Sequence, residues 1–267
     1  MGILNITPDS FADGGLHFNI DRAVDAGLRM ADEGADILDI GGESTRPGAS
    51  QVGADEEMRR VLPVIERLAP RTKALISIDT YKAVVAEQAI LRGAAIVNDI
   101  SGLQYDERLG EVAATAEAPL VLMHTRGRSE SMYEHARYSD VASEVAFELG
   151  HAIKRAEASG VRRDALILDP GFGFAKRAEH SFELLANLSK LAELDRPLLA
   201  GTSRKSFLKD ALGDRLPSER EWGTAAAVAA SVLAGAHIVR VHGVREMQDV
   251  VRVADRILAH GQQTNQT

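Results

Sequence analysis

The feature that most restricts the fold of this chain is a regular alternation of two kinds of segment. Short apolar runs recur along the whole length, and a stretch with helical periodicity follows each of them. The runs are almost continuously hydrophobic, which is typical of parallel strands buried on both faces. The predicted strands are Gly2–Ile6, Asp36–Gly41, Ala74–Asp79, Ala95–Asp99, Leu120–His124, Leu166–Asp169, Leu198–Gly201 and Ile238–His242. The predicted helices are Ile20–Glu33, Asp55–Leu68, Lys82–Arg92, Glu107–Glu117, Asp140–Ala158, Glu179–Leu191, Trp222–Ala234 and Arg245–His260.

Strand and helix pairs repeated in this way predict an α/β chain folded as a closed (β/α)8 TIM barrel, rather than an open doubly wound sheet. No low-complexity linker or shift of composition divides the 267 residues. We therefore expect one domain over residues 1–267, with the last few residues forming a disordered tail.

Composition excludes several classes of function. A net charge of −8 and an aromatic content of 4% argue against nucleic-acid binding. No apolar run is long enough for a membrane span, and the N-terminus lacks a basic, apolar signal segment. The chain has no Cys, which excludes disulfides and thiolate metal sites and fits a cytoplasmic location.

Polar residues stand where almost every predicted strand meets its following loop. One or two of them would be explained as helix caps, but a nearly complete series is not. Because these strand ends converge on one face of a barrel, we expect an active site there. The series is Asn5, Asp39, Asp79, Asn98 with Asp99, His124, Asp169, Gly201, and Arg240 with His242.

The sixth strand and its turn, Leu166–Phe174, carry the most specific of these signals. An Asp at the end of a buried strand needs a fixed donor or cation to remain ionised. A flat heterocycle with two adjacent N–H groups would satisfy both oxygens of Asp169, and Phe174 offers a ring beside it. The simpler interpretation is that Asp169 caps the Pro-Gly turn.

Cations gather after the last two strands. Residues 202–206 place Arg204 and Lys205 between hydroxyl side chains at the expected start of a helix, a pattern that favours anion binding. Arg240 and His242 alternate on the eighth strand, so both should face the mouth of the barrel, where Arg would grip a phosphate. A solvated basic loop and a buried structural His are the alternatives.

Two long loops, Thr7–Asn19 and Gly42–Ala54, follow the first two strands, and loops of this length usually act as lids or binding loops. Arg46 adds a cation on the second loop. The chain has no Walker motif, zinc-protease motif or nucleophile elbow, and no obvious covalent nucleophile. Fixed carboxylates beside cations therefore indicate a polar planar ring held deep in the site, with an anionic leaving group at its rim.

These motifs, in this order, resemble the dihydropteroate synthase family over essentially the whole chain. The matching segments are Met1–Asn5, Asp39–Gly48, Ile78–Thr80, Asn98–Ile100, Leu122–His124, Asp169–Phe174, Ser203–Ser206 and Arg240–His242. The resemblance implies condensation of 6-hydroxymethyl-7,8-dihydropterin diphosphate with 4-aminobenzoate, with Mg²⁺-assisted, SN1-like departure of diphosphate followed by attack of the amine.

The same resemblance assigns roles to individual residues. Catalysis would rest on Asp79, Lys205, Asp13 and Arg240. The pterin would be held by Asp79, Asn98, Met123, Asp169 and Lys205. Diphosphate would meet Asn5, Arg46, Arg240 and His242, with Asn5 also binding Mg²⁺. The aminobenzoate site would consist of Thr45, Arg46, Pro47, Phe174, Lys205 and Ser206.

Two other functions stay open: a pterin-dependent methyltransferase, and a pterin-binding module without catalysis. The resemblance also implies a homodimer formed through Thr224–Ala236, although that Ala-rich run could simply pack on the barrel, and competition by sulfonamides. Family members usually carry a segment before the first strand, whereas here the strand begins at Met1. The stretch Arg126–Arg137 receives no role.

Overall fold

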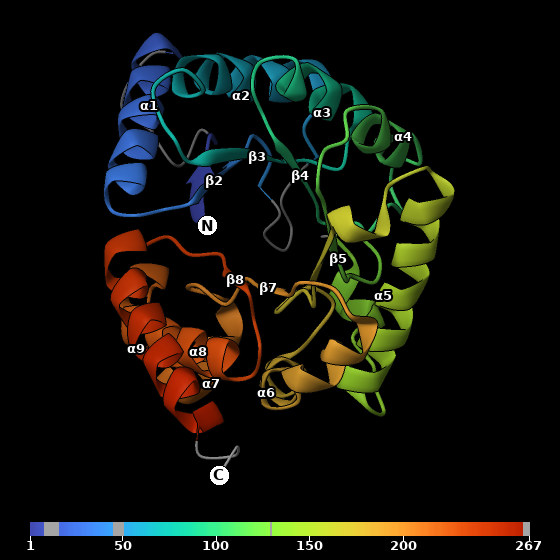
Figure 1. The fold of residues 1–267 in the computed structure, drawn as a ribbon, viewed down its shortest axis with the longest axis vertical. Helices are drawn as coiled ribbons and strands as arrows, with labels where there is room; N and C mark the ends of the chain where they lie inside the picture. Colours follow the sequence, from blue (N-terminus) through green and yellow to red (C-terminus); the bar gives the residue numbers. More distant parts are fainter. Residues whose placement is uncertain (8–15, 45–50, 129, 264–267) are drawn as a thin grey trace.

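The computed structural model describes residues 1–7, 16–44, 51–128 and 130–263, and within these it has the predicted eight parallel strands ringed by helices (Figure 1). The strands are β1 Gly2–Asn5, β2 Ile37–Gly41, β3 Leu75–Asp79, β4 Ile96–Asp99, β5 Leu120–Met123, β6 Leu166–Asp169, β7 Leu199–Ala200 and β8 Ile238–Val239. The tail predicted for the last residues falls outside the described part.

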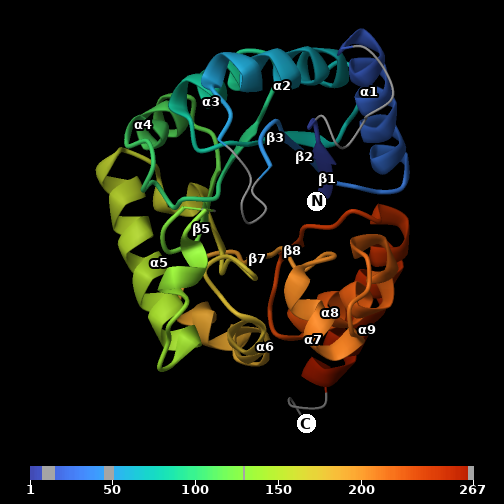
Figure 2. The same ribbon diagram turned by 180° about the vertical axis from the view of Figure 1, so that it is seen from behind.

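Helices alternate with the strands along the chain. The α-helices are α1 Leu16–Asp32, α2 Ala54–Leu68, α3 Ala83–Ile90, α4 Arg108–Thr115, α5 Val141–Ala158, α6 Ala178–Ala186, α7 Lys209–Leu212, α8 Glu221–Leu233 and α9 Val244–Gln263. Short 3-10 turns are η2 Met132–His135, η3 Arg163–Ala165, η4 Leu188–Leu194, η5 Ser206–Leu208 and η6 Pro217–Glu219. Figure 2 shows the same ring of helices from behind.

Backbone hydrogen bonds close the sheet into a barrel. Strands β1 to β6 pair in sequence order, and β7 pairs with β8. Parallel bridges join Leu168 to Leu198 on one side and Gly2 to Val241 on the other. Met1 then contributes twice, since its carbonyl accepts from Val241 N at 2.9 Å and its amino group donates to Val239 O at 2.9 Å. The closed barrel predicted from the alternating pattern is therefore confirmed.

Some element boundaries differ from the prediction. Strands β7 and β8 have two residues each, and isolated bridges continue the pairing beside them, at Leu198 before β7 and at Val241 after β8. The helix predicted over Glu179–Leu191 ends at Ala186 and continues as a 3-10 turn, because Asn187 leaves the helical conformation at φ −114° and ψ 18°. The helix expected to start near residues 202–206 is reduced to the 3-10 turn η5 and the very short α7.

The interior of the barrel changes from apolar to polar along the strands. A buried cluster fills its lower part; the members of this cluster are Ile96, Val121 and Leu199, with Met1, Ile37, Ile167 and Ile238 packed against them. Two residues further along each strand the side chain points inward again. After Ile37, Ile96, Ile167 and Ile238 those positions carry Asp39, Asn98, Asp169 and Arg240. Asp79 pairs with Asn98 in the sheet, so these five side chains form a polar layer above an apolar floor.

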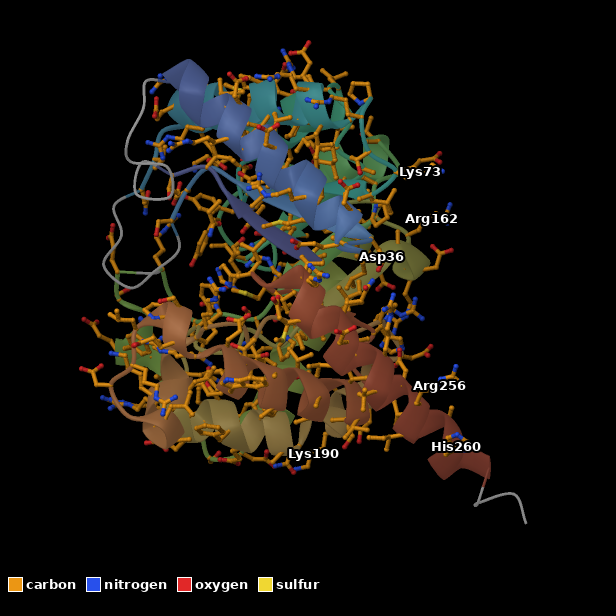
Figure 3. All side chains as sticks on the ribbon, turned by 90° about the vertical axis from the view of Figure 1, so that its left-hand side faces the viewer. Asp36, Lys73, Arg162, Lys190, Arg256 and His260 are labelled. Atoms are coloured by element: carbon orange, nitrogen blue, oxygen red, sulfur yellow. The ribbon has the colours of Figure 1, made fainter. Side chains whose placement is uncertain are left out.

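The N-terminal ends of the strands carry exposed charged side chains. Asp36, Lys73 and Arg162 precede β2, β3 and β6, and Figure 3 shows all of them projecting from one side of the molecule. These side chains mark the face away from the predicted site. Among the described helices, none has both the length and the apolarity that crossing a membrane requires.

Candidate active site

Arg240 stands at the centre of the polar layer. Its Nε donates to Asp39 Oδ2 at 2.6 Å, and its Nη2 donates to Asp79 Oδ2 at 2.7 Å. Asn98 Nδ2 donates to the same Asp39 oxygen at 3.0 Å. Four strand ends, those of β2, β3, β4 and β8, are thereby joined through side chains. The structure thus brings together three predicted site residues, Asp79, Asn98 and Arg240.

The charged side chains of this network are largely buried, which shifts their pKa values. The carboxylate of Asp39 is fully buried, that of Asp79 is 12% exposed, and the side chain of Arg240 is 17% exposed. Burial raises the pKa of Asp79, Arg240 opposes this shift, and Asp39 adds to it. Two acids that share one guanidinium are therefore held next to each other, where positive charge developing nearby would be stabilised.

Asp169 fits both interpretations that the sequence left open. Gly171 N donates to Asp169 Oδ1 at 2.7 Å, so one carboxylate oxygen does cap the turn. Among the described residues none donates to Oδ2, and Gly201, which has no side chain, leaves space in front of it. Burial raises the pKa of Asp169, while the Gly171 hydrogen bond and Lys205 oppose the shift. One oxygen is structural, and the other is available for a ligand.

The turn after β6 requires glycine at position 171. Gly171 has φ +69°, and a Cβ added there would lie 2.0 Å from the carbonyl oxygen of His124. The close approach of these two strands' loops therefore depends on a residue without a side chain.

Lys205 faces the mouth of the barrel, whereas its neighbour does not. Lys205 Nζ lies 4.1 Å from the centroid of the Phe174 ring. Burial lowers the pKa of Lys205 to about 8, and Arg240 adds to this effect, while Asp169 and Asp79 oppose it. Arg204 instead pairs with Glu221 at 2.9 Å, behind the loop.

The prediction of two cations at a helix N-terminus is therefore wrong in part. Residues 206–208 form a 3-10 turn, and α7 has only four residues, so there is no long helix whose dipole could bind an anion. The anion-binding potential of this loop rests on the side chain of Lys205. Ser206, predicted to contact aminobenzoate, is exposed at the start of the turn.

His242 and Asn5 lie at the ends of neighbouring strands, as predicted. Ser203 Oγ lies 2.9 Å from His242 Nδ1 and accepts from its backbone N–H at 3.2 Å, which fixes the ring beside the Lys205 loop. Asn5 ends β1 and is half-buried. Of the described residues, no group of three His, Cys, Asp or Glu side chains could enclose a metal ion.

An apolar wall borders the polar layer. Met123 and Phe174, predicted to pack on the pterin and the aminobenzoate, belong to one buried cluster with Ile100, Met132 and Ala175. Residues Asp13, Thr45, Arg46 and Pro47 lie outside the described residues, so their roles remain predictions.

Lys176 and His124 form a buried pair whose role the sequence did not reveal. Lys176 is 1% exposed, and its Nζ lies 2.8 Å from His124 Nδ1. The sequence signal that indicates its burial is its position directly after the apolar turn residues Phe174 and Ala175. A charged residue that close to a buried strand end cannot readily reach solvent.

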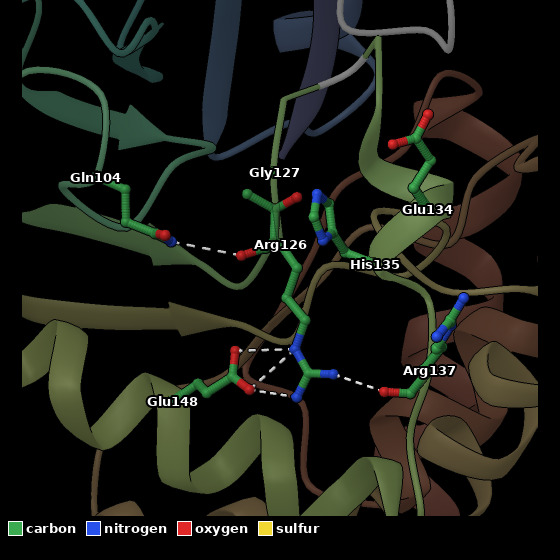
Figure 4. A pocket seen from close by; sticks show the side chains of 8 residues that line it. Gln104, Arg126, Gly127, Glu134, His135, Arg137 and Glu148 are labelled. Atoms are coloured by element: carbon green, nitrogen blue, oxygen red, sulfur yellow. Dashed lines mark hydrogen bonds and ion pairs between the residues drawn. The ribbon is translucent and has the colours of Figure 1, made fainter.

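The segment Arg126–Arg137, which received no role, borders an open hollow of about 680 Å³ (Figure 4). Arg126 lies at its base and pairs with Glu148 and, at 2.8 Å, with Glu144, both on α5. It also donates to the carbonyl of Arg137 at 2.7 Å. Arg126 thus ties the loop after β5 to the barrel wall.

Comparisons of the chain with known proteins agree on a single family. A family model described as pterin binding enzyme matches residues 1–242. The chain is 44% identical to dihydropteroate synthase of Escherichia coli K12, over 97% of this chain and 91% of the relative. Its structure is similar to that of Xanthomonas albilineans dihydropteroate synthase with 4-aminobenzoic acid, at 44% identity, a TM-score of 0.91 and coverage of 97% and 92%. A Yersinia pestis dihydropteroate synthase in a sulfonamide drug complex gives 42% identity, a TM-score of 0.91 and coverage of 97% and 94%.

Proposed function

The chain belongs to the pterin-binding enzyme family and, within it, to the dihydropteroate synthases. On this basis we propose which residues at the mouth of its barrel bind each substrate and which assist the reaction. The enzyme is a transferase that joins 6-hydroxymethyl-7,8-dihydropterin diphosphate to 4-aminobenzoate and releases diphosphate. The observation that carries the assignment of roles is the polar layer, in which Arg240 contacts acids from two other strands.

The pterin ring is bound in the deepest part of the mouth. The open oxygen of Asp169 accepts an N–H of the ring's amidine edge, and Asn98 and Lys205 complete the polar contacts. Met123 packs on one face of the ring. Because Asp169 is also held by the turn, its orientation is set before the ligand arrives, which lowers the entropy lost on binding.

The diphosphate leaves toward Arg240, His242 and Asn5. Arg240 has five N–H donors, of which Asp39 and Asp79 take two, so donors remain for a phosphate oxygen. The amide oxygen of Asn5 fits Mg²⁺, which prefers oxygen ligands and usually keeps water and substrate phosphates in the rest of its shell. When bound, the ion would neutralise charge on the departing diphosphate.

Breaking the CH₂–O bond leaves positive charge on the pterin carbon, which Asp79 stabilises electrostatically. The prediction that Asp13 assists from the first loop belongs to the same step. The amine of aminobenzoate then attacks, with Phe174 as a wall of its site. Since the amine is neutral and the carbon is strongly electrophilic, neither a strong base nor a covalent enzyme intermediate is required.

A turnover assay tests this function directly. Purified protein is supplied with both substrates and Mg²⁺, and diphosphate and dihydropteroate are quantified, with a second sample containing excess EDTA. We expect both products in equal amounts, and loss of turnover with EDTA that added Mg²⁺ restores. A methyltransferase would release no diphosphate, and a non-catalytic module would bind the pterin without turnover.

Sulfonamides provide a second test of the aminobenzoate site. We propose that they compete with aminobenzoate, as the complex of the Yersinia pestis relative suggests. Raising the aminobenzoate concentration should then restore the uninhibited rate. Inhibition that is independent of aminobenzoate would place the drug elsewhere.

We propose a homodimer formed by α8 and α9, which lie side by side on the outside of the barrel (Figures 1 and 2). Large apolar side chains of these two helices are exposed: Trp222 at 85%, Val253 at 61%, Ile257 at 56% and Leu233 at 44%. The other side of α8, including Ala227 and Val228, packs on the barrel, so the proposed dimer uses only the outward side of the Ala-rich run.

Light scattering after gel filtration tests the dimer. Trp222→Lys should give a monomer, because a charge would be buried in the interface in place of the most exposed apolar side chain. Phe147→Lys is the matched control, since this side chain is 70% exposed on α5, away from the proposed interface. A wild-type monomer, or a dimer that survives Trp222→Lys, contradicts the proposed surface. The cytoplasmic location stays a prediction that cell fractionation tests.

A further inference from the structure

A buried lysine that the reaction does not use lies behind the turn after β6. Lys176 Nζ is 3.1 Å from the carbonyl oxygen of Gly171, 3.1 Å from that of Phe174 and 2.8 Å from Nδ1 of His124. Burial lowers the pKa of Lys176 to about 7, while Asp169 and Glu148 oppose this shift. In its protonated form the amine has three donors, and these three acceptors account for all of them. The side chain therefore holds both ends of the turn to the end of β5.

We propose that Lys176 is a positioning residue for both substrate sites, because its ammonium group clamps the turn Gly171–Phe174 on which Asp169 and Lys205 depend. This inference rests on the proposed function, since it concerns binding of the same pterin and aminobenzoate.

Each end of the clamped turn touches a residue assigned to substrate binding. At one end, Gly171 N donates to Asp169 Oδ1 at 2.7 Å, so a shift of Gly171 rotates the carboxylate that receives the pterin. At the other end, the Phe174 ring lies 4.1 Å from Lys205 Nζ. A shift of Phe174 therefore alters both the aminobenzoate wall and the packing around Lys205.

The clamp is itself anchored to α5. With Nδ1 accepting from Lys176, the proton of the neutral His124 ring is on Nε2, which lies 3.0 Å from Glu148 Oε2 and donates to it. Burial lowers the pKa of His124 to about 4, and Lys176 adds to this, so the ring stays a neutral acceptor at neutral pH. Arg126 holds Glu148 from the other side (Figure 4). The turn is thus fixed to a helix of the barrel wall.

The test compares Lys176→Met with wild-type protein, varying each substrate in turn. Met fills similar space without the three donors. We expect the KM of pterin diphosphate and that of aminobenzoate to rise about tenfold, with a smaller change in kcat, because the loss falls on binding geometry. Lys154→Met is the control, since Lys154 is exposed on α5, and it should change neither constant.

A purely structural role predicts a different pattern. It would lower the fraction of active protein, and with it the apparent kcat, while both KM values stay at the wild-type level. Unchanged KM values in folded Lys176→Met overturn the proposal. If this variant does not fold, His124→Leu decides, because leucine has no acceptor and should raise both KM values to a smaller extent. Unchanged KM values there overturn the proposal equally.

Restoring the ammonium group gives an independent readout. The chain has no Cys, so Lys176→Cys can be alkylated selectively with 2-bromoethylamine in denaturant and refolded, with wild type taken through the same steps. The resulting side chain differs from lysine by one sulfur atom. It should return the KM values toward those of wild type, and folded alkylated protein that keeps high KM values refutes the clamp.

Titration calorimetry with pterin diphosphate separates this inference from the proposed function. Wild-type protein that binds the pterin but shows no turnover would refute the function and leave the clamp to be judged by the dissociation constant. A rise of that constant of about tenfold in Lys176→Met supports the clamp in either case. An unchanged dissociation constant overturns it.

Discussion

Replacing Arg240 by Met should destabilise the protein strongly, because it removes the cation that joins two buried acids. The guanidinium lies 2.6 Å from Asp39 and 2.7 Å from Asp79. Neither acid gains access to water when Arg240 is shortened, since Asp39 is fully buried and Asp79 is 12% exposed. The variant therefore keeps the cost of burying the acids and loses what offset it.

Two charge-assisted hydrogen bonds are lost, at about 1.5–3 kcal/mol each. Direct measurements on other buried ion pairs give about 3–5 kcal/mol when one partner is removed, which agrees with that sum. We therefore expect the free energy of unfolding to fall by about 3–5 kcal/mol near neutral pH.

The loss should depend on pH in a defined direction. Burial raises the pKa of Asp79, and Arg240 opposes that shift, so removing Arg240 raises this pKa further. A folded acid with a raised pKa keeps a proton that the unfolded chain releases. The free energy of unfolding is therefore highest below the unfolded pKa of the acid, and it falls as pH rises from there through the folded pKa. The destabilisation should be larger at about pH 8 than at about pH 5.

Urea denaturation of both proteins at these two pH values measures the effect. Arg252→Met is the control, because its pair with Asp249 spans 3.8 Å with side chains that are 68% and 76% exposed, so it should cost less than about 1 kcal/mol. A loss for Arg240→Met that is below about 1 kcal/mol, or equal at both pH values, would refute the reasoning.

Two further substitutions test the surroundings of the site. Gly171→Ala and Gly235→Ala both place a side chain at positive φ, +69° and +101°, which costs about 1–2 kcal/mol. Only at Gly171 does the new Cβ meet an atom, the His124 oxygen at 2.0 Å, so thermal unfolding should show a much larger loss there, and equal losses would contradict the contact. Lys205→Met should abolish turnover yet stabilise unliganded protein by about 1–3 kcal/mol near neutral pH, because burial lowers the pKa of Lys205 to about 8. That penalty is present below the folded pKa and fades toward the ordinary pKa of Lys, so a stability gain that persists unchanged at about pH 10.5 would be inconsistent with it.

The sequence by itself determined the architecture and the face that carries the site. Continuous apolar runs predicted strands buried on both sides, and their repetition with helical stretches between them favoured a closed barrel. Polar residues at the strand ends, from Asn5 to Arg240, then had to converge on one mouth. The alternation of side chains along a strand is a local property, and for that reason the sequence reveals it.

Contacts between distant strands were decided only by the tertiary structure. Arg240 and Asp39 are separated by 201 residues, and the strand register decides that they meet. The sequence could not show that Arg204 turns back to Glu221 while Lys205 turns inward, because neighbouring residues of a loop have no fixed alternation.

The burial of Lys176 is the clearest case of this limit. In the sequence it is one Lys among 31 basic residues, and only the close approach of the β5 and β6 loops surrounds it with acceptors. That approach depends on the missing side chain of Gly171. Local pattern thus fixed which face binds, while packing between loops fixed which charges are aimed at the ligand and which hold the site in place.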